Sequence, residues 1–197
     1  MKKYEILWRE ILNQTIEAKN TIFRQKQLAA KFGFSTSTVF HALKKPRAIG
    51  AIRVWNRGFE LINFEKLLFL WASERKFRSD IIYQTKVNSP VFEIEGNLPP
   101  NIIPATYTAF RLKFNNVPAD YDKVYVYTGS KKEVKRRFPP TNGEPNLIVL
   151  KMDPWLKQFA PFPPLSQIFV DLWNLPEWYA KEFQNALLDK IKAKLGQ

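Results

Sequence analysis

The chain has 197 residues, no cysteine, and 31 Lys and Arg against 18 Asp and Glu, which gives a net charge of +13. The lack of cysteine excludes a disulfide scaffold, thiolate metal sites and cysteine nucleophiles, while 45% hydrophobic residues suffice for packed cores. No signal peptide is recognisable at the N-terminus, and the longest apolar run, residues 67–72, is too short to span a membrane. We therefore expect a cytoplasmic protein without membrane contact.

The positive charge is concentrated in the first part of the chain. Residues 1–80 carry a net charge of +9 and residues 81–197 a net charge of +4. Between Ala18 and Phe59 there are nine Lys and Arg and no acidic residue. Such a stretch is either a solvated basic surface or a surface for a polyanionic partner such as nucleic acid.

Apolar spacing predicts three helices near the N-terminus. The first covers residues 4–16, the second residues 24–32, and the third begins at Ser35 or Thr36 and ends near Lys44. Gly33 stands where a left-handed residue would end the second helix and turn the chain.

The third helix is expected to bury Val39, Phe40 and Leu43. Together with the small Ala29 on the second helix and the turn at Gly33, these residues have the spacing that helix-turn-helix packing requires.

A β-hairpin is predicted directly after the third helix. Apolar residues alternate on both sides of the turn-forming triplet 56–58, and a further helix is expected over residues 64–77. The order of helix, helix-turn-helix and hairpin across residues 4–63 resembles the winged helix-turn-helix family of transcriptional regulators. The resemblance implies a recognition helix in the major groove of double-stranded DNA and a hairpin, or wing, beside it.

The candidate DNA-binding residues are the polar and basic side chains of the predicted recognition helix, its neighbouring helix and the hairpin. Ser, Thr and His side chains suit base edges, and Lys and Arg side chains suit phosphates. The complete set is Arg24, Gln25, Ser35, Thr36, Ser37, Thr38, His41, Lys44, Lys45, Arg47, Arg53, Asn56 and Arg57.

The remainder of the chain alternates predicted strands and helices. Strands are expected at residues 91–95, 122–127 and 147–150. Helices are expected at 130–137 with Ser130 as cap, at 165–173, and at 177–195 with Pro176 in the first turn. The predicted fold class is therefore α+β, with a winged helix-turn-helix domain at residues 1–78 and a small α/β domain at residues 79–197 whose strand order is not readable.

Four segments of this second part resemble the abortive-infection type IV antitoxin (AbiEi-like) family: residues 104–110, 124–127, 146–150 and 164–173. The resemblance implies a winged helix joined to an α/β domain and repression of the protein's own operon. It also implies a cognate toxin or another protein as partner of the second domain, and it is compatible with a homodimer.

We therefore expect a sequence-specific DNA-binding transcriptional regulator, antitoxin-like, with no catalytic residues, metal or cofactor. The alternative is a nuclease or nucleotidyltransferase-like enzyme that its winged helix targets to DNA. Asp122 with Glu133-Val134-Lys135, or Gly129-Ser130, would begin such a site, but no carboxylate pair follows at metal-binding spacing. A structural or RNA-binding module is the remaining alternative.

Overall fold

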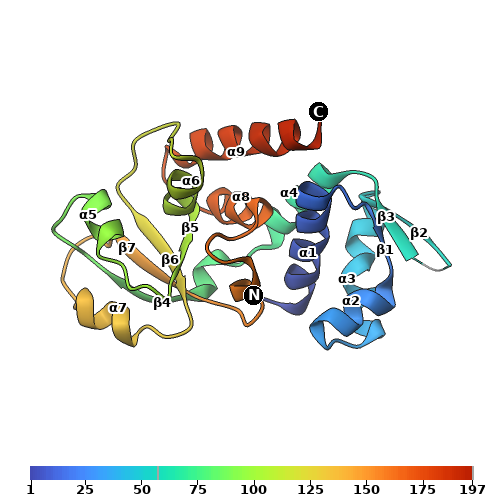
Figure 1. Ribbon diagram of the computed structural model, residues 1–197, viewed down its shortest axis with the longest axis horizontal. Coiled ribbons are helices and arrows are strands. Elements are labelled where there is room, and N and C mark those ends of the chain that lie inside the picture. The colour runs from blue at the N-terminus through green and yellow to red at the C-terminus, as the bar shows by residue number, and fades with distance from the viewer. Residues whose placement is uncertain (57, 197) are drawn as a thin grey trace. The chain divides into compact units, whose positions relative to one another are not determined.

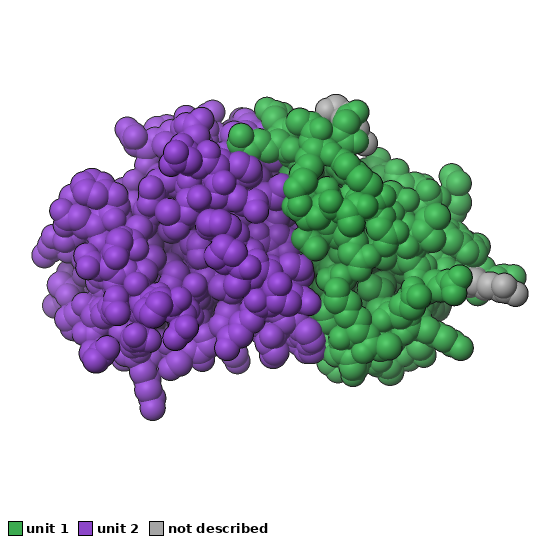
Figure 2. Space-filling view, viewed as in Figure 1, with its two compact units in different colours: residues 1–75, 189–197 green, residues 76–188 purple. Residues whose placement is uncertain are grey.

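The computed structural model describes residues 1–56 and 58–196. The architecture is α+β, and the chain divides into two compact units (Figures 1 and 2). The first unit contains residues 1–75 and 189–197, and the second contains residues 76–188. The sequence placed the division after residue 78 and assigned the end of the chain to the second domain, whereas that segment groups with the first unit.

The first unit has 17 Lys and Arg against 7 Asp and Glu, a net charge of +10.

The first unit combines helices with a small antiparallel sheet. The predicted helices and the hairpin are present, and a two-residue strand that the sequence did not predict pairs with the hairpin. The strand order is β1-β3-β2. The elements are α1 (Lys3–Ala18), β1 (Ile22–Phe23), α2 (Gln25–Phe32), α3 (Thr36–Ala48), β2 (Ile52–Trp55), β3 (Gly58–Leu61) and α4 (Phe64–Glu74) (Figure 1).

The turn between α2 and α3 has the geometry that its residues favour. Gly33 adopts the left-handed conformation, with φ of 65°, which glycine enters without steric cost. The next amide, that of Phe34, donates to the carbonyl of Ala29 at 2.9 Å. Ser35 then caps α3, because its hydroxyl accepts from the amide of Thr38 at 3.1 Å. These contacts fix where α3 begins.

Helix α3 continues to Ala48, beyond the predicted end at Lys44, although it contains Pro46. Proline has no amide hydrogen, so the carbonyl of Ala42 lacks the donor that residue i+4 normally supplies. The buried indole of Trp8 on α1 supplies it instead, donating from Nε1 to that carbonyl at 2.8 Å. A tertiary contact therefore allows a helix to continue through a residue that usually ends one.

The prediction that Phe40 is buried is wrong, since its side chain is 49% exposed. The buried face of α3 is formed by Val39, Ala42, Leu43 and Pro46. Successive helical residues differ by about 100°, so Phe40 lies well away from the centre of this face. An aromatic ring on α3 therefore faces solvent beside the polar residues.

The hairpin packs through Phe59, which lies opposite Val54 on β2 and Phe23 on β1. The Phe23 and Phe59 rings stack with centroids 5.3 Å apart. Next to them, Gly58 approaches the backbone so closely that a Cβ would lie 2.4 Å from the carbonyl oxygen of Phe23. Close approach explains why β3 begins with glycine.

Replacement of Gly58 by alanine is therefore expected to disturb the β1–β3 pairing and to destabilise the first unit by about 1–3 kcal/mol. Gly96, at the end of a helix in the second unit, is the matched control because a Cβ there meets nothing within 4 Å. Thermal unfolding of both variants provides the comparison. Equal stability of the Gly58→Ala variant and the parent protein would contradict the packing argument.

The second unit is built on a four-stranded mixed sheet of order β4-β7-β6-β5. Only the central β6–β7 pair is parallel. The elements are β4 (Ile81–Thr85), α5 (Val91–Gly96), β5 (Ile103–Ala105), α6 (Thr106–Phe114), β6 (Val124–Thr128), α7 (Lys132–Arg137), β7 (Leu147–Lys151), α8 (Leu165–Trp173) and α9 (Ala180–Leu195), with 3-10 turns at Phe77–Asp80 and Leu156–Phe159. The last residues of α9 belong to the first unit.

Several predictions for the second unit are corrected. The segment 91–95 is helical rather than a strand, because Val91 and Ile94 share a helix face and the Pro90 carbonyl accepts from the amides of residues 93 and 94. An alternation over five residues is too short to distinguish the helical period of about 3.6 residues from the strand period of 2. Helix α7 begins after Lys131 rather than at Ser130. Helix α9 begins at Ala180, not beside Pro176. Strands β4 and β5 and helix α6 were not predicted.

In the described part of the chain, no helix is long and apolar enough to cross a membrane.

Candidate nucleic-acid interface

The solvent-facing side of α3 consists of two parallel stripes of side chains. Residues three or four apart lie on the same helix face. We call Ser37, Phe40, Lys44 and Arg47 the outer stripe, and all four are exposed. We call Thr38, His41 and Lys45 the inner stripe, and its three residues line a pocket together with residues of α1 and α4.

The outer stripe carries one aromatic ring among polar groups. The ammonium of Lys44 lies 5.5 Å from the ring centroid of Phe40, and the same ring lies 5.7 Å from the imidazole of His41 in an edge-on arrangement. Such cation–π contacts orient a long side chain without neutralising it. The sequence analysis did not identify Phe40 as a surface residue. Its position about 100° around the helix from the buried Val39 could have indicated its exposure.

A second hollow, of about 490 Å³, lies where the beginnings of α2 and α3 meet the hairpin. It brings together four predicted residues from three elements: Arg24, Gln25, Thr36 and Asn56. Lys26 also lines this hollow and was not among the candidates, although it lies in the acid-free stretch. The predicted residue Arg57 lies outside the described residues.

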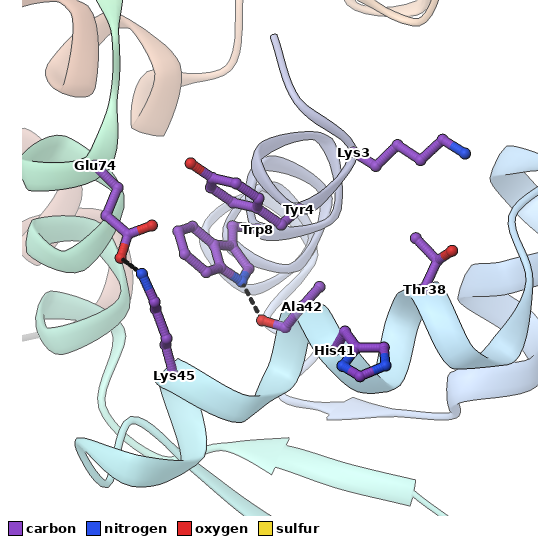
Figure 3. Close-up of a pocket in the computed structure, with 8 residues that line it drawn as sticks. All are labelled: Lys3, Tyr4, Trp8, Thr38, His41, Ala42, Lys45 and Glu74. Atoms are coloured by element: carbon purple, nitrogen blue, oxygen red, sulfur yellow. Dashed lines mark hydrogen bonds and ion pairs between the residues drawn. The ribbon is translucent and has the colours of Figure 1, made fainter.

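The inner stripe lines a pocket of about 350 Å³ (Figure 3). Its lining consists of Lys3, Tyr4, Trp8, Thr38, His41, Ala42, Lys45 and Glu74. Lys45 forms an ion pair with Glu74. A phosphate that bound Lys45, as the sequence predicted, would have to compete with this carboxylate. Burial, with the carboxylates of Glu5 and Glu74, raises the pKa of Tyr4 to about 12, and its phenol is neutral at physiological pH. The ammonium of Lys3 lies 5.3 Å from the ring of Phe34.

Cations of the first unit differ sharply in whether they have acidic partners. Five are paired with carboxylates: Lys31 with Glu10, Lys45 with Glu74, Arg75 with Glu5, Lys192 with Glu65, and Lys194 with Glu17. Nine others form no ion pair with any residue that the structure describes: Lys2, Lys3, Lys19, Arg24, Lys26, Lys44, Arg47, Arg53 and Lys66. Five of these nine, Arg24, Lys26, Lys44, Arg47 and Arg53, belong to α2, α3 or the hairpin or directly precede them. Their charge is not neutralised within the unit.

Asp122 and Glu133, the carboxylates of the enzyme alternative, and the buried Asp171 serve separate contacts in the second unit. Asp122 accepts from the hydroxyl of Tyr179 at 2.5 Å, buried Asp171 accepts from the hydroxyl of Tyr127, and Glu133 lies 4.0 Å from Arg137. Among the described residues, no group of three His, Cys, Asp or Glu side chains is arranged to hold a metal ion. None of these three contacts joins one of the carboxylates to another.

A polar cluster around Glu177 was not predicted from the sequence. Its carboxylate accepts from the hydroxyls of Tyr107 at 3.1 Å and Tyr125 at 3.2 Å and lies 3.0 Å from the ammonium of Lys123. Burial, and then the charge of Glu177, raise the pKa of both tyrosines. Because the carboxylate is occupied by these internal partners, we assign the cluster a structural role.

No protein-family model matches the chain, and neither a curated protein nor a solved structure matches it.

Proposed function

We propose that the first unit is a winged helix-turn-helix that binds double-stranded DNA, and that the protein is a sequence-specific transcriptional regulator. One observation carries the proposal: the exposed outer stripe of α3 lies among the cations that have no acidic partner. Unpaired cations beside an exposed helix face supply the phosphate attraction and the helical surface that major-groove binding requires.

The two kinds of DNA contact are assigned to different side chains. The hydroxyl of Ser37 and the imidazole of His41 reach base edges in the major groove, and the ring of Phe40 contacts a thymine methyl group. Lys44 and Arg47 toward the end of α3 bind phosphates and so set the register of the helix. Arg24 and Asn56 add backbone contacts from the hollow beside the hairpin.

An antitoxin-like autorepressor is the narrower form of the proposal, as the resemblance of the second domain implies. In that form the operator lies next to the protein's own gene, and the second unit binds a cognate toxin. A palindromic operator would indicate that two copies bind together.

Selection from a random pool of DNA duplexes tests the proposal. We expect enrichment of one motif, and the same protein should prefer duplex DNA over structured RNA at matched salt. A pool that stays random after several rounds would reject sequence-specific binding. Preference for RNA would favour the RNA-binding alternative, and metal-dependent cleavage of the pool would favour a nuclease.

Single substitutions on α3 are expected to separate the two kinds of contact. Ser37→Ala and His41→Ala should lower discrimination at one or two base positions by roughly 10-fold, since each removes a group that reaches base edges. Lys44→Ala should instead weaken binding to all duplexes by similar factors. Affinities measured on the selected motif and on its single-base variants distinguish these patterns. Uniform losses in all three variants would reject our assignment of the base-reading residues.

A further inference from the structure

The pocket beside the inner stripe has the composition of a small-molecule site (Figure 3). Its volume of about 350 Å³ is in the range of ligand pockets. Its base is aromatic, because the ring of Tyr4 lies 4.7 Å from that of Trp8. The indole is held in place by its hydrogen bond to the carbonyl of Ala42. The pocket therefore has an apolar base whose indole is oriented by a hydrogen bond.

The ionisable groups of the pocket determine which charge a ligand should carry. Among the described residues of the lining, Glu74 supplies the only carboxylate, and it is already paired with Lys45. Lys3 adds a second cation. Lys3, Lys45 and Glu74 together give the lining one net positive charge. Lys45 and Glu74 neutralise each other, so the remaining charge of the lining is that of Lys3, and it favours an anionic ligand over a cationic one.

We propose that this pocket binds a small aromatic carboxylate. Its ring lies against Tyr4 and the methyl group of Ala42, and its carboxylate pairs with Lys45 in exchange for Glu74. The aromatic base supplies the apolar contact, and the charged rim fixes the orientation, which is the usual division of roles in a ligand pocket.

The pocket also shares His41 with the surface to which we assign DNA binding, and this step of the inference rests on that proposed function. A bound anion places negative charge on the flank of α3 and occupies Lys45, so DNA phosphates are repelled. We expect duplex affinity to fall by roughly 5- to 10-fold when the pocket is filled. Linkage requires that the duplex lower ligand affinity by the same factor.

Calorimetry with 1-naphthoate tests the pocket on the full-length chain without DNA, so the result does not depend on the proposed function. The neutral 1-naphthylmethanol and the cationic 1-naphthylmethylamine have closely similar ring shapes and serve as ligand controls. We expect naphthoate to bind at one site and both controls to bind roughly 10-fold more weakly or not at all. Absence of naphthoate binding, or tighter binding of the amine, would overturn the proposal.

The two members of the ion pair provide a sharper test, because they should act in opposite directions. Lys45→Gln removes the cation and should weaken naphthoate binding, whereas Glu74→Gln removes the competing carboxylate and should tighten it. Lys66→Gln and Glu65→Gln change the net charge equally on the same helix as Glu74 and should leave binding unchanged. Effects of equal sign at Lys45 and Glu74, or equal effects in the controls, would contradict the assigned contact.

Duplex titrations with and without naphthoate test the coupling. Unchanged duplex affinity in a protein that binds naphthoate would overturn the coupling and leave the pocket assignment supported. If the protein binds no duplex at all, the proposed function fails, and the calorimetry alone decides whether the pocket binds aromatic carboxylates.

Discussion

Simultaneous replacement of Arg24, Lys44 and Arg47 by glutamine is expected to lower the affinity for any DNA duplex by on the order of 10²-fold at 0.15 M salt. Each phosphate contact contributes about 0.9 to the slope of log affinity against log salt, which corresponds to roughly 5-fold in affinity at this salt relative to 1 M. The slope itself should therefore become shallower by about 3. Filter binding or fluorescence anisotropy across a salt series measures both quantities.

A matched control is available in the second unit. Helix α7 lies in a run with five basic residues among seven, and Lys132, Lys135 and Arg136 in it are exposed. Their replacement by glutamine removes the same charge from a different surface. We expect this variant to bind duplex DNA nearly as well as the parent protein. An equal loss in both triple variants would show that net charge, rather than the surface around α3, accounts for binding.

Substitutions of Trp8 are expected to cause the largest loss of stability in the first unit. Its side chain is 1% exposed, so Trp8→Ala should cost about 3–5 kcal/mol of unfolding free energy through the cavity that it leaves. Trp8→Phe keeps most of the apolar volume but removes the indole donor. That change should cost about 1–3 kcal/mol, because the carbonyl of Ala42 is then buried without its donor.

The reason for the hydrogen bond can be tested with Pro46. In a Pro46→Ala background, residue 46 has an amide hydrogen that reaches the carbonyl of Ala42 within the helix. Trp8→Phe should then cost at least ~1 kcal/mol less than it does in the parent protein. Hydrogen exchange of amides in α1 and α3 measures these free energies in the first unit itself. An identical cost in both backgrounds would show that the indole does not substitute for the missing amide.

The sequence by itself determined the local features that depend on residues close together in the chain. The apolar stripe of α1, the left-handed turn at Gly33, the cap at Ser35 and the hairpin after α3 were all predicted. Each depends on short-range geometry: helix periodicity, the conformational freedom of glycine, a hydroxyl acceptor, and alternation across a turn. The acid-free stretch could also be read from the sequence, because the charge of a side chain follows from its residue type.

Only the tertiary structure decided how these features are used. The indole that lets α3 continue past Pro46 comes from a residue 34 positions before its acceptor, and the exposure of Phe40 depends on which side of α3 the other helices cover. The strand order of the second unit required the same long-range information. The partners of the cations were also set by packing: Lys44 and Lys45 are adjacent and identical in chemistry, yet only Lys45 reaches Glu74. Burial and pairing depend on distances between segments remote in sequence. For that reason the sequence predicts a set of candidate residues but not their division into an outer stripe and a pocket.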